Sequence, residues 1–196
     1  MRIVLDGAHG AGKSTFLYGS TQVQNNISIK KLGYPIFSDL IGDSFNEGKN
    51  VGVVPPKDQQ DYNVLFDIIA RRGLEQYLEG DGKEIYWYER GIHYINVIAE
   101  MDGYSVPIDI LALIQKVQYD YVFVFDPIES CDFSNVHKMG CRSFTLEDRY
   151  DCVEKTCKVY EKVGNKVCRV PVFSPDEDEN FLLRYNFMKK HVCALK

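Results

Sequence analysis

The chain has 196 residues, of which 45% are hydrophobic and 26% are charged, and its formal net charge is −5. This length and composition suit one globular α/β domain with a well-filled core, and they argue against a disordered or repetitive chain. Because the charge is negative and no run of Lys or Arg is long enough to follow a polynucleotide backbone, we do not expect a nucleic acid polymer as a partner.

The N-terminal residues MRIVLDG lead straight into an apolar run, so we expect no signal peptide, and no apolar stretch reaches membrane-spanning length. Six cysteines occur without the spacing of metal ligands. We therefore expect a cytoplasmic protein with reduced cysteines. The sequence does not determine the oligomeric state and leaves a homodimer open.

The segment GAHGAGKS, residues 7–14, fits the pattern G-x-x-x-x-G-K-[ST] of a phosphate-binding loop. An apolar run precedes it, and a helix is predicted from Thr15 to about Gln24, so the motif has its strand-loop-helix context. Glycines let backbone N–H groups approach phosphate oxygens closely. We expect nine residues to bind the phosphates of a nucleotide: Gly7, Ala8, His9, Gly10, Ala11, Gly12, Lys13, Ser14 and Thr15. Lys13 is expected to reach the β- and γ-phosphates, and the Ser14 hydroxyl to coordinate Mg²⁺.

A second strand is predicted over residues 34–37, shortly before Asp39. Residues 42–57 contain several Gly and Pro residues and predict an irregular loop. Apolar residues recur at helical spacing over 58–79, which predicts a helix that stops at Gly80. The segment EIYWYERG then predicts a strand that ends in the charged pair Glu89-Arg90.

Helices are predicted from about Ile92 to Met101 and after Pro107. The run YVFVF, residues 121–125, is entirely apolar and predicts a central parallel strand buried on both faces. Asp126 closes this strand.

Residues 128–144 contain few apolar side chains and predict a mobile lid segment. Thr145 is predicted to cap a helix that runs to about Val163, with Asp148 at its third position. A last strand is predicted over 166–173, and the acidic residues 176–178 begin a C-terminal helix.

Strands that alternate with helices predict a three-layer α/β domain, in which helices cover both faces of a parallel sheet of about five strands. Ligands of such sheets lie at the carboxyl ends of the strands. That edge should hold the phosphate-binding loop, Asp39, the pair Glu89-Arg90 and Asp126.

The segment YERGIHYINVIA resembles the E-R-S segment of deoxynucleoside kinases and the D-R segment of thymidylate kinases. The order of YVFVFDP, Cys141-Arg142-Ser143, a helix ending in VYEKVG and Val170-Pro171-Val172 resembles the P-loop proteins of AAA-domain family 28, which include the ribosylnicotinamide kinase module. The resemblance covers nearly the whole chain and implies a P-loop NTPase fold. In this sequence Gly91 replaces the serine of E-R-S, and Asp39 stands where deoxynucleoside kinases carry glutamate.

Asp39 is a candidate to accept the proton of an attacking hydroxyl or to hold Mg²⁺ through a water. The alternative is a helix-capping or turn aspartate, with Asp43 as a competitor. A charged pair such as Glu89-Arg90 is costly to bury unless it is paired or faces a site. By the resemblance, Glu89 contacts Mg²⁺ or the acceptor, and Arg90 contacts phosphate or the acceptor; the alternative is a solvated cap at Gly91.

Asp126 closes its strand in the manner of a Walker B aspartate and is predicted to bind Mg²⁺, the alternative being a turn. The resemblance makes Arg142 a lid arginine that neutralises charge on the transferred phosphoryl group. Arg149 is a second candidate, although its helix favours a surface salt bridge. His9 and His93 lack a partner at fixed spacing and are interpreted as packing or loop residues.

We therefore expect a kinase that uses ATP and Mg²⁺ to phosphorylate a small acceptor, foremost a nucleoside or nucleoside monophosphate. Its catalytic residues are predicted to be Lys13, Asp39, Glu89, Arg90 and Arg142. GTP is an alternative donor. The alternative function is a nucleotide-dependent switch with a protein or lipid partner, and the absence of an N-K-x-D signature weighs against a Ras-type GTPase.

Overall fold

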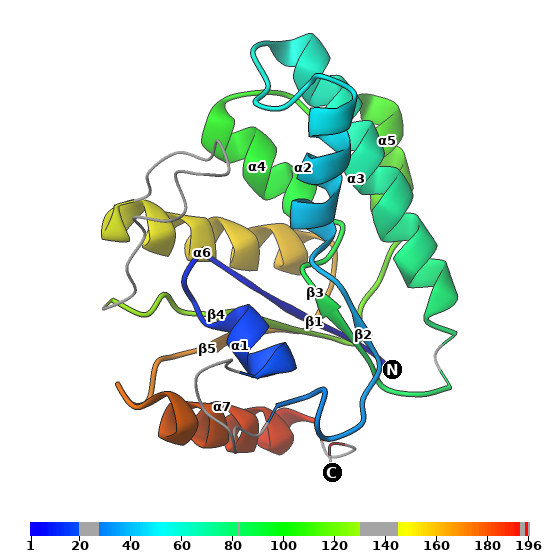
Figure 1. The fold of residues 1–196 in the computed structure, drawn as a ribbon. Helices are drawn as coiled ribbons and strands as arrows, with labels where there is room; N and C mark the ends of the chain where they lie inside the picture. Colours follow the sequence, from blue (N-terminus) through cyan, green and yellow to red (C-terminus); the bar gives the residue numbers. More distant parts are fainter. Residues whose placement is uncertain (20–27, 82, 130–144, 193–194, 196) are drawn as a thin grey trace.

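The computed structural model describes residues 1–19, 28–81, 83–129, 145–192 and 195. Its ribbon shows a sheet with helices on both faces (Figure 1). The elements follow in the order β1 (Arg2–Gly7), α1 (Lys13–Tyr18), β2 (Ile36–Phe37), α2 (Leu40–Asn50), α3 (Gln59–Glu79), β3 (Tyr86–Glu89), α4 (Tyr94–Asp102), α5 (Ile108–Ile114), β4 (Tyr121–Phe125), α6 (Leu146–Lys162), β5 (Val167–Val170) and α7 (Glu177–His191).

The described strands form one five-stranded sheet in the order β2-β3-β1-β4-β5, and each neighbouring pair is parallel. β1 lies at the centre, with Leu5 opposite Glu89 of β3 and Gly7 opposite Phe125 of β4. All five strands therefore end at the same edge. This arrangement confirms the predicted three-layer α/β architecture.

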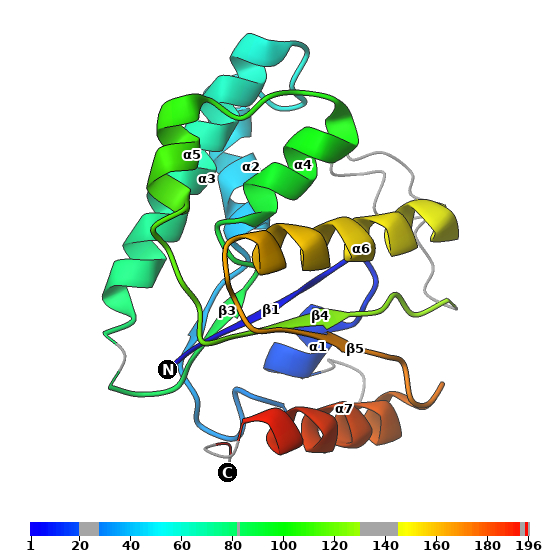
Figure 2. The ribbon, with the colours of Figure 1, turned by 180° about the vertical axis from the view of Figure 1, so that it is seen from behind.

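Alternating side chains of the central strands supply two hydrophobic cores, because successive residues of a strand face opposite sides of the sheet. Val4 belongs to the core covered by α2 to α6, whereas Ile3 and Leu5 belong to the core covered by α1 and α7. The view from behind shows the same division, with α7 on one face and α6 on the other (Figure 2). The apolar run YVFVF is β4, and its last four side chains are completely buried, as predicted.

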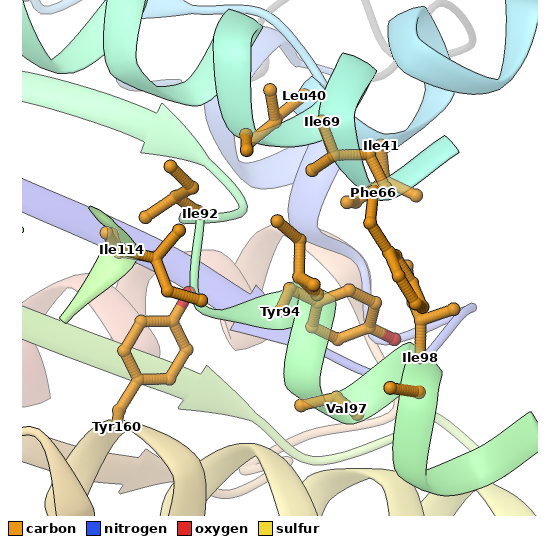
Figure 3. Close-up of a cluster of buried hydrophobic side chains, with 14 of the residues drawn as sticks. Leu40, Ile41, Phe66, Ile69, Ile92, Tyr94, Val97, Ile98, Ile114 and Tyr160 are labelled. Atoms are coloured by element: carbon orange, nitrogen blue, oxygen red, sulfur yellow. The ribbon is translucent and has the colours of Figure 1, made fainter. Parts of the chain in front are cut away.

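The hydrophobic core on the α6 face of the sheet holds together the helices that flank the carboxyl ends of β1 and β3. Figure 3 shows Phe66 and Ile69, Tyr94 and Ile98, and Tyr160 converging between their helices. These side chains come from α3, α4 and α6, respectively.

The prediction of an irregular loop over residues 42–57 is wrong for the first half of this range, which belongs to α2. Asp39 caps this helix, and its buried residues include Leu40 and Ile41. Gly48 reflects close packing rather than a turn, because a Cβ atom there would lie 2.6 Å from Val54 Cγ2.

The predicted cap of α6 is confirmed. The Thr145 hydroxyl accepts a hydrogen bond from Asp148 N, and the Asp148 carboxylate accepts one from Thr145 N, which is a capping box. Most of the predicted lid, residues 130–144, lies outside the described residues. None of the described helices combines the length and hydrophobicity needed to cross a membrane.

Candidate active site

The phosphate-binding loop connects β1 to α1 at the carboxyl edge of the sheet. Gly7 has a φ of 124°, and a Cβ atom there would lie 2.5 Å from the Phe125 carbonyl oxygen, so β4 leaves no room for a side chain. Gly12 is the N-cap of α1 in the left-handed conformation, with a φ of 79°. The loop thus turns back tightly against β4 before the helix begins.

Lys13 is folded back over its own loop. Its Nζ atom donates hydrogen bonds to the carbonyl oxygens of Gly7, at 3.0 Å, and Ala8, at 2.8 Å. Burial, with the nearby charge of Arg90, lowers the pKa of Lys13 to about 8. The ammonium group is therefore held at the loop and is partly desolvated.

Ser14 contacts Glu89, which lies at the end of β3. Ser14 Oγ donates a hydrogen bond to Glu89 Oε1 at 2.5 Å. Burial raises the pKa of Glu89, and the hydrogen bond from Ser14 opposes that rise. A hydroxyl and a carboxylate are both oxygen donors of the kind that Mg²⁺ prefers.

Arg90 is buried against the start of the loop, with 3% of its side chain exposed. Its Nη1 atom lies 3.2 Å from the Gly7 carbonyl oxygen and 3.4 Å from Asp6 Oδ1, and the guanidinium lies 4.2 Å from the centre of the Tyr94 ring. Its φ of 66° is the one positive value among the described residues that are not glycine. Such strained backbone is typical of functional positions, and the alternative of a solvated cap is wrong for both residues of the pair.

Asp39 has a structural contact and faces the site as well. Its Oδ1 atom accepts a hydrogen bond from Ile41 N at 3.1 Å, which caps α2, and lies 3.8 Å from Arg90 Nε. The side chain is 44% exposed. Asp43 instead accepts a hydrogen bond from Ser38.

Asp6 was not singled out in the sequence, although it is a charged residue at the end of an apolar strand. It is completely buried, and its carboxylate accepts hydrogen bonds from Gly7 N and from the Tyr160 hydroxyl, both at 2.8 Å. The Tyr160 hydroxyl also accepts a hydrogen bond from Gly91 N at 3.0 Å. Asp6 and Tyr160 therefore join the phosphate-binding loop to the segment that carries Arg90.

Asp126 lies at the carboxyl edge as predicted, but its carboxylate is paired with Arg169, with Arg169 Nε 2.5 Å from Asp126 Oδ1. Arg169 also pairs with Glu154. Within the part of the chain that the structure describes, no group of three or more His, Cys, Asp or Glu side chains is arranged to hold a metal ion.

Arg149 is buried, whereas its helix favoured a place on the surface. It is 2% exposed and donates hydrogen bonds to the carbonyl oxygens of His9, Gly10 and Ile128. Arg184 of α7 is equally buried, and sequence reasoning did not find it because no motif marks it.

His9 and His93 lie in surroundings that lower their pKa values and favour the neutral imidazole. Burial and the surrounding cations lower the pKa of His9 to about 3. His93 is completely buried, with Nε2 2.9 Å from the Val117 carbonyl oxygen. The positions of His9 and His93 agree with packing and loop roles. Arg142, the predicted lid arginine, lies outside the described residues.

Comparisons with known proteins agree with this architecture. A family model described as an AAA domain matches residues 2–177. The structure of deoxyadenosine kinase from M. mycoides with bound dATP has a TM-score of 0.54 and 17% identity, over 96% of this chain and 100% of that chain. A second structure of that enzyme, with the products dCMP and a flexible dCDP bound, has a TM-score of 0.59 and 18% identity, over 97% and 100%. No curated protein matches significantly in sequence. The structural likeness supports the predicted P-loop NTPase fold.

Proposed function

The chain belongs to the AAA-domain family, and we propose that it is a kinase that transfers the γ-phosphoryl group of ATP to a nucleoside. The observation that carries this proposal is the contact between Ser14 of the loop and Glu89 of β3. This contact joins the expected phosphate site to a carboxylate at the carboxyl edge of the neighbouring strand. The likeness to deoxyadenosine kinase, whose structures hold dATP or nucleotide products, supports the same reaction class.

The donor phosphates are proposed to lie on the loop N–H groups, with Lys13 beside them. Ser14 and Glu89 offer the oxygen atoms that would hold Mg²⁺, which supplies positive charge to the phosphates when it is bound. We propose Glu89 rather than Asp126 as the Mg²⁺ ligand, because the Asp126 carboxylate forms an ion pair with Arg169.

The charge around Tyr18 supports a neutral acceptor. Burial raises the pKa of the Tyr18 hydroxyl, and the negative charges of three carboxylates raise it further. They belong to Glu89, Asp39 and Asp43. A nucleoside hydroxyl brings no charge to these carboxylates, and the likeness to deoxyadenosine kinase points the same way, so we propose a nucleoside.

Asp39 is proposed as the group that accepts the proton of the attacking hydroxyl. Its side chain is 44% exposed and therefore accessible to an acceptor, whereas Glu89 is buried against Ser14. Arg90 lies 3.8 Å from Asp39 and against the loop, so it can orient the carboxylate beside the reacting phosphate.

A groove beside the loop suits the base of the donor. Its lining is formed largely by apolar side chains, which offer surface for an aromatic ring: Pro127, Ile128, Tyr150, Pro171, Phe173 and Pro175. We propose ATP as the donor and keep GTP as the alternative, which competition between the two nucleotides would resolve.

Three further features are proposals. We propose a single domain over residues 1–196 with a lid at 128–144 that carries Arg142, and a homodimer, which light scattering can test. The free cysteines among the described residues, Cys152, Cys157 and Cys168, support the cytoplasmic location that we propose.

The proposal is tested by measuring ADP production from Mg²⁺-ATP with separate pools of nucleosides and nucleoside monophosphates. We expect a nucleoside pool to raise ADP production by the wild type and not by Lys13→Ala. Stimulation by the monophosphate pool alone would contradict the neutral acceptor. Slow hydrolysis that no acceptor changes would instead support the nucleotide-dependent switch.

A further inference from the structure

Five consecutive carbonyl groups of the phosphate-binding loop contact cations. Each of the five consecutive carbonyl oxygens from Gly7 to Ala11 accepts a hydrogen bond from a positively charged side chain. Lys13 donates to the first two carbonyl oxygens. Arg149 donates to the third, 3.1 Å from its Nε atom, and to the fourth, 3.4 Å from its Nη2 atom. Arg184 donates to the fifth, which lies 2.6 Å from its Nη1 atom.

The two arginines come from helices that follow the loop by more than a hundred residues in sequence. Arg149 lies on α6 and Arg184 on α7, on opposite faces of the sheet, and each is 2% exposed. Both also bind carbonyl groups at or beyond the ends of β4 and β5. Arg149 donates to Ile128 O at 2.9 Å, and Arg184 donates to Asp126 O and Pro171 O, each at 3.1 Å.

This arrangement has a geometric consequence for the loop. The C=O and N–H groups of a trans peptide point in opposite directions, so a carbonyl held toward one side directs its N–H group to the other. A phosphate-binding loop works through N–H groups that converge on an anion. The arginines therefore hold the amides ready for the phosphates without contacting them.

Burying these cations is costly, which indicates that they have a purpose beyond filling space. Burial lowers the pKa of Arg184 to about 10. Arg184 donates hydrogen bonds to three backbone carbonyl oxygens, and its guanidinium lies 4.2 Å from the centre of the Phe125 ring. A buried arginine that binds backbone carbonyls in place of a carboxylate keeps its positive charge behind the loop, where an anion on the other side benefits from it.

We infer that Arg149 and Arg184 are positioning residues that preorganise the loop for the polyphosphate of the donor. This inference rests on the proposed function, because it assumes that the loop binds a donor nucleotide. A purely structural brace would support the fold and leave the affinity of the folded protein for polyphosphate unchanged.

The test uses inorganic tripolyphosphate, which has the charge of the donor and no base, and measures its Kd by calorimetry. The variants are Arg149→Met and Arg184→Met, and the matched controls remove one cation from the same helices, Lys155→Met on α6 and Lys189→Met on α7. Lys155 is paired with Asp151 away from the loop, and Lys189 is exposed. We expect the Kd to rise by about tenfold or more in each arginine variant and by less than about twofold in each control.

Hydrogen exchange gives a second readout that a general loss of stability would not reproduce. We expect faster exchange in the peptide that contains residues 7–14 and unchanged exchange in β3 for both arginine variants. Where circular dichroism shows that a methionine variant is unfolded, the corresponding Arg→Lys variant takes its place. Lysine keeps the positive charge but lacks the forked set of donors of arginine. We therefore expect the Kd to rise in the lysine variant as well, but by less than in the methionine variant.

Folded arginine variants that bind tripolyphosphate within about twofold of the wild type, or no more weakly than their lysine controls, would overturn the inference. Failure of the proposed function gives a different pattern. In that case the wild type still binds tripolyphosphate and the arginine variants still bind it more weakly, while no acceptor raises ADP production.

Discussion

Ser14 donates a hydrogen bond to Glu89 at 2.5 Å, although 75 positions separate the two residues in sequence. The contact exists because β1 and β3 are parallel neighbours whose carboxyl ends meet at one edge. It joins the residue expected to coordinate Mg²⁺ to a buried carboxylate.

Glu89→Gln should raise the Mg²⁺ concentration needed for half-maximal activity by about tenfold, because an amide oxygen is a weaker ligand than a carboxylate. The size and shape of the side chain stay nearly the same, and the amide oxygen can still accept the hydrogen bond from Ser14. The measurement is ADP production against Mg²⁺ at saturating ATP. Glu84→Gln, on an exposed residue ahead of the same strand, is the control and should behave as the wild type.

Asp39→Asn should lower kcat by about 10²- to 10⁴-fold, the usual contribution of a positioned general base. Asparagine caps helices as well as aspartate does, so the stability of α2 should be retained. Asp58→Asn makes the same change at the N-cap of α3, where Asp58 accepts hydrogen bonds from Gln60 N and Asp61 N. A comparable fall in kcat for Asp58→Asn would show that the effect comes from capping.

ATP affinity should fall as the pH rises above about 8, because burial lowers the pKa of Lys13 to about 8 in the free protein. The phosphates of bound ATP favour the charged ammonium and raise this pKa, so binding takes up a proton near and above that pH. Calorimetry at pH 8.5 in two buffers of different ionisation enthalpy measures the proton uptake. Lys13→Met should abolish it, and an uptake that persists in this variant would assign the proton to another group.

Tyr160→Phe should lower the free energy of unfolding by about 1–3 kcal/mol, because it removes a partner from a buried carboxylate and a buried amide. The Tyr160 hydroxyl donates to Asp6 and accepts from Gly91 N. Urea unfolding measures the change. Tyr121→Phe, on a partly exposed tyrosine of β4, should alter stability by less than about 0.5 kcal/mol. Equal effects of the two substitutions would contradict the role of the buried network.

The parts of the fold that follow from local pattern were predictable. The glycine-rich loop, the apolar run of β4 and the capping box of α6 are each encoded within a few neighbouring residues. α2 was missed because Gly48 was interpreted as a turn residue, whereas it is required by the approach of Val54. Only the folded chain shows that contact.

Asp39, Glu89 and Arg90 could be proposed from the sequence because each lies at or shortly after the end of a strand, and the structure places Asp39 beside Arg90. Arg149 was named from the sequence only as a second candidate beside Arg142, and Arg184 was not found. Their contacts with the loop could not be predicted, because backbone carbonyl partners leave no trace in the residue types. Asp6 left a weak trace, a charge at the end of an apolar strand. Its buried partner Tyr160 lies 154 positions away.

Transfer of labelled phosphate tests the central claim most directly. The wild type is incubated with ATP labelled at the γ-phosphate, Mg²⁺ and a nucleoside that raises ADP production, and the products are separated and identified. The account predicts label in a nucleoside monophosphate, in an amount equal to the ADP formed, and none with Lys13→Ala. Label found only as inorganic phosphate would contradict it and identify a hydrolase or a switch.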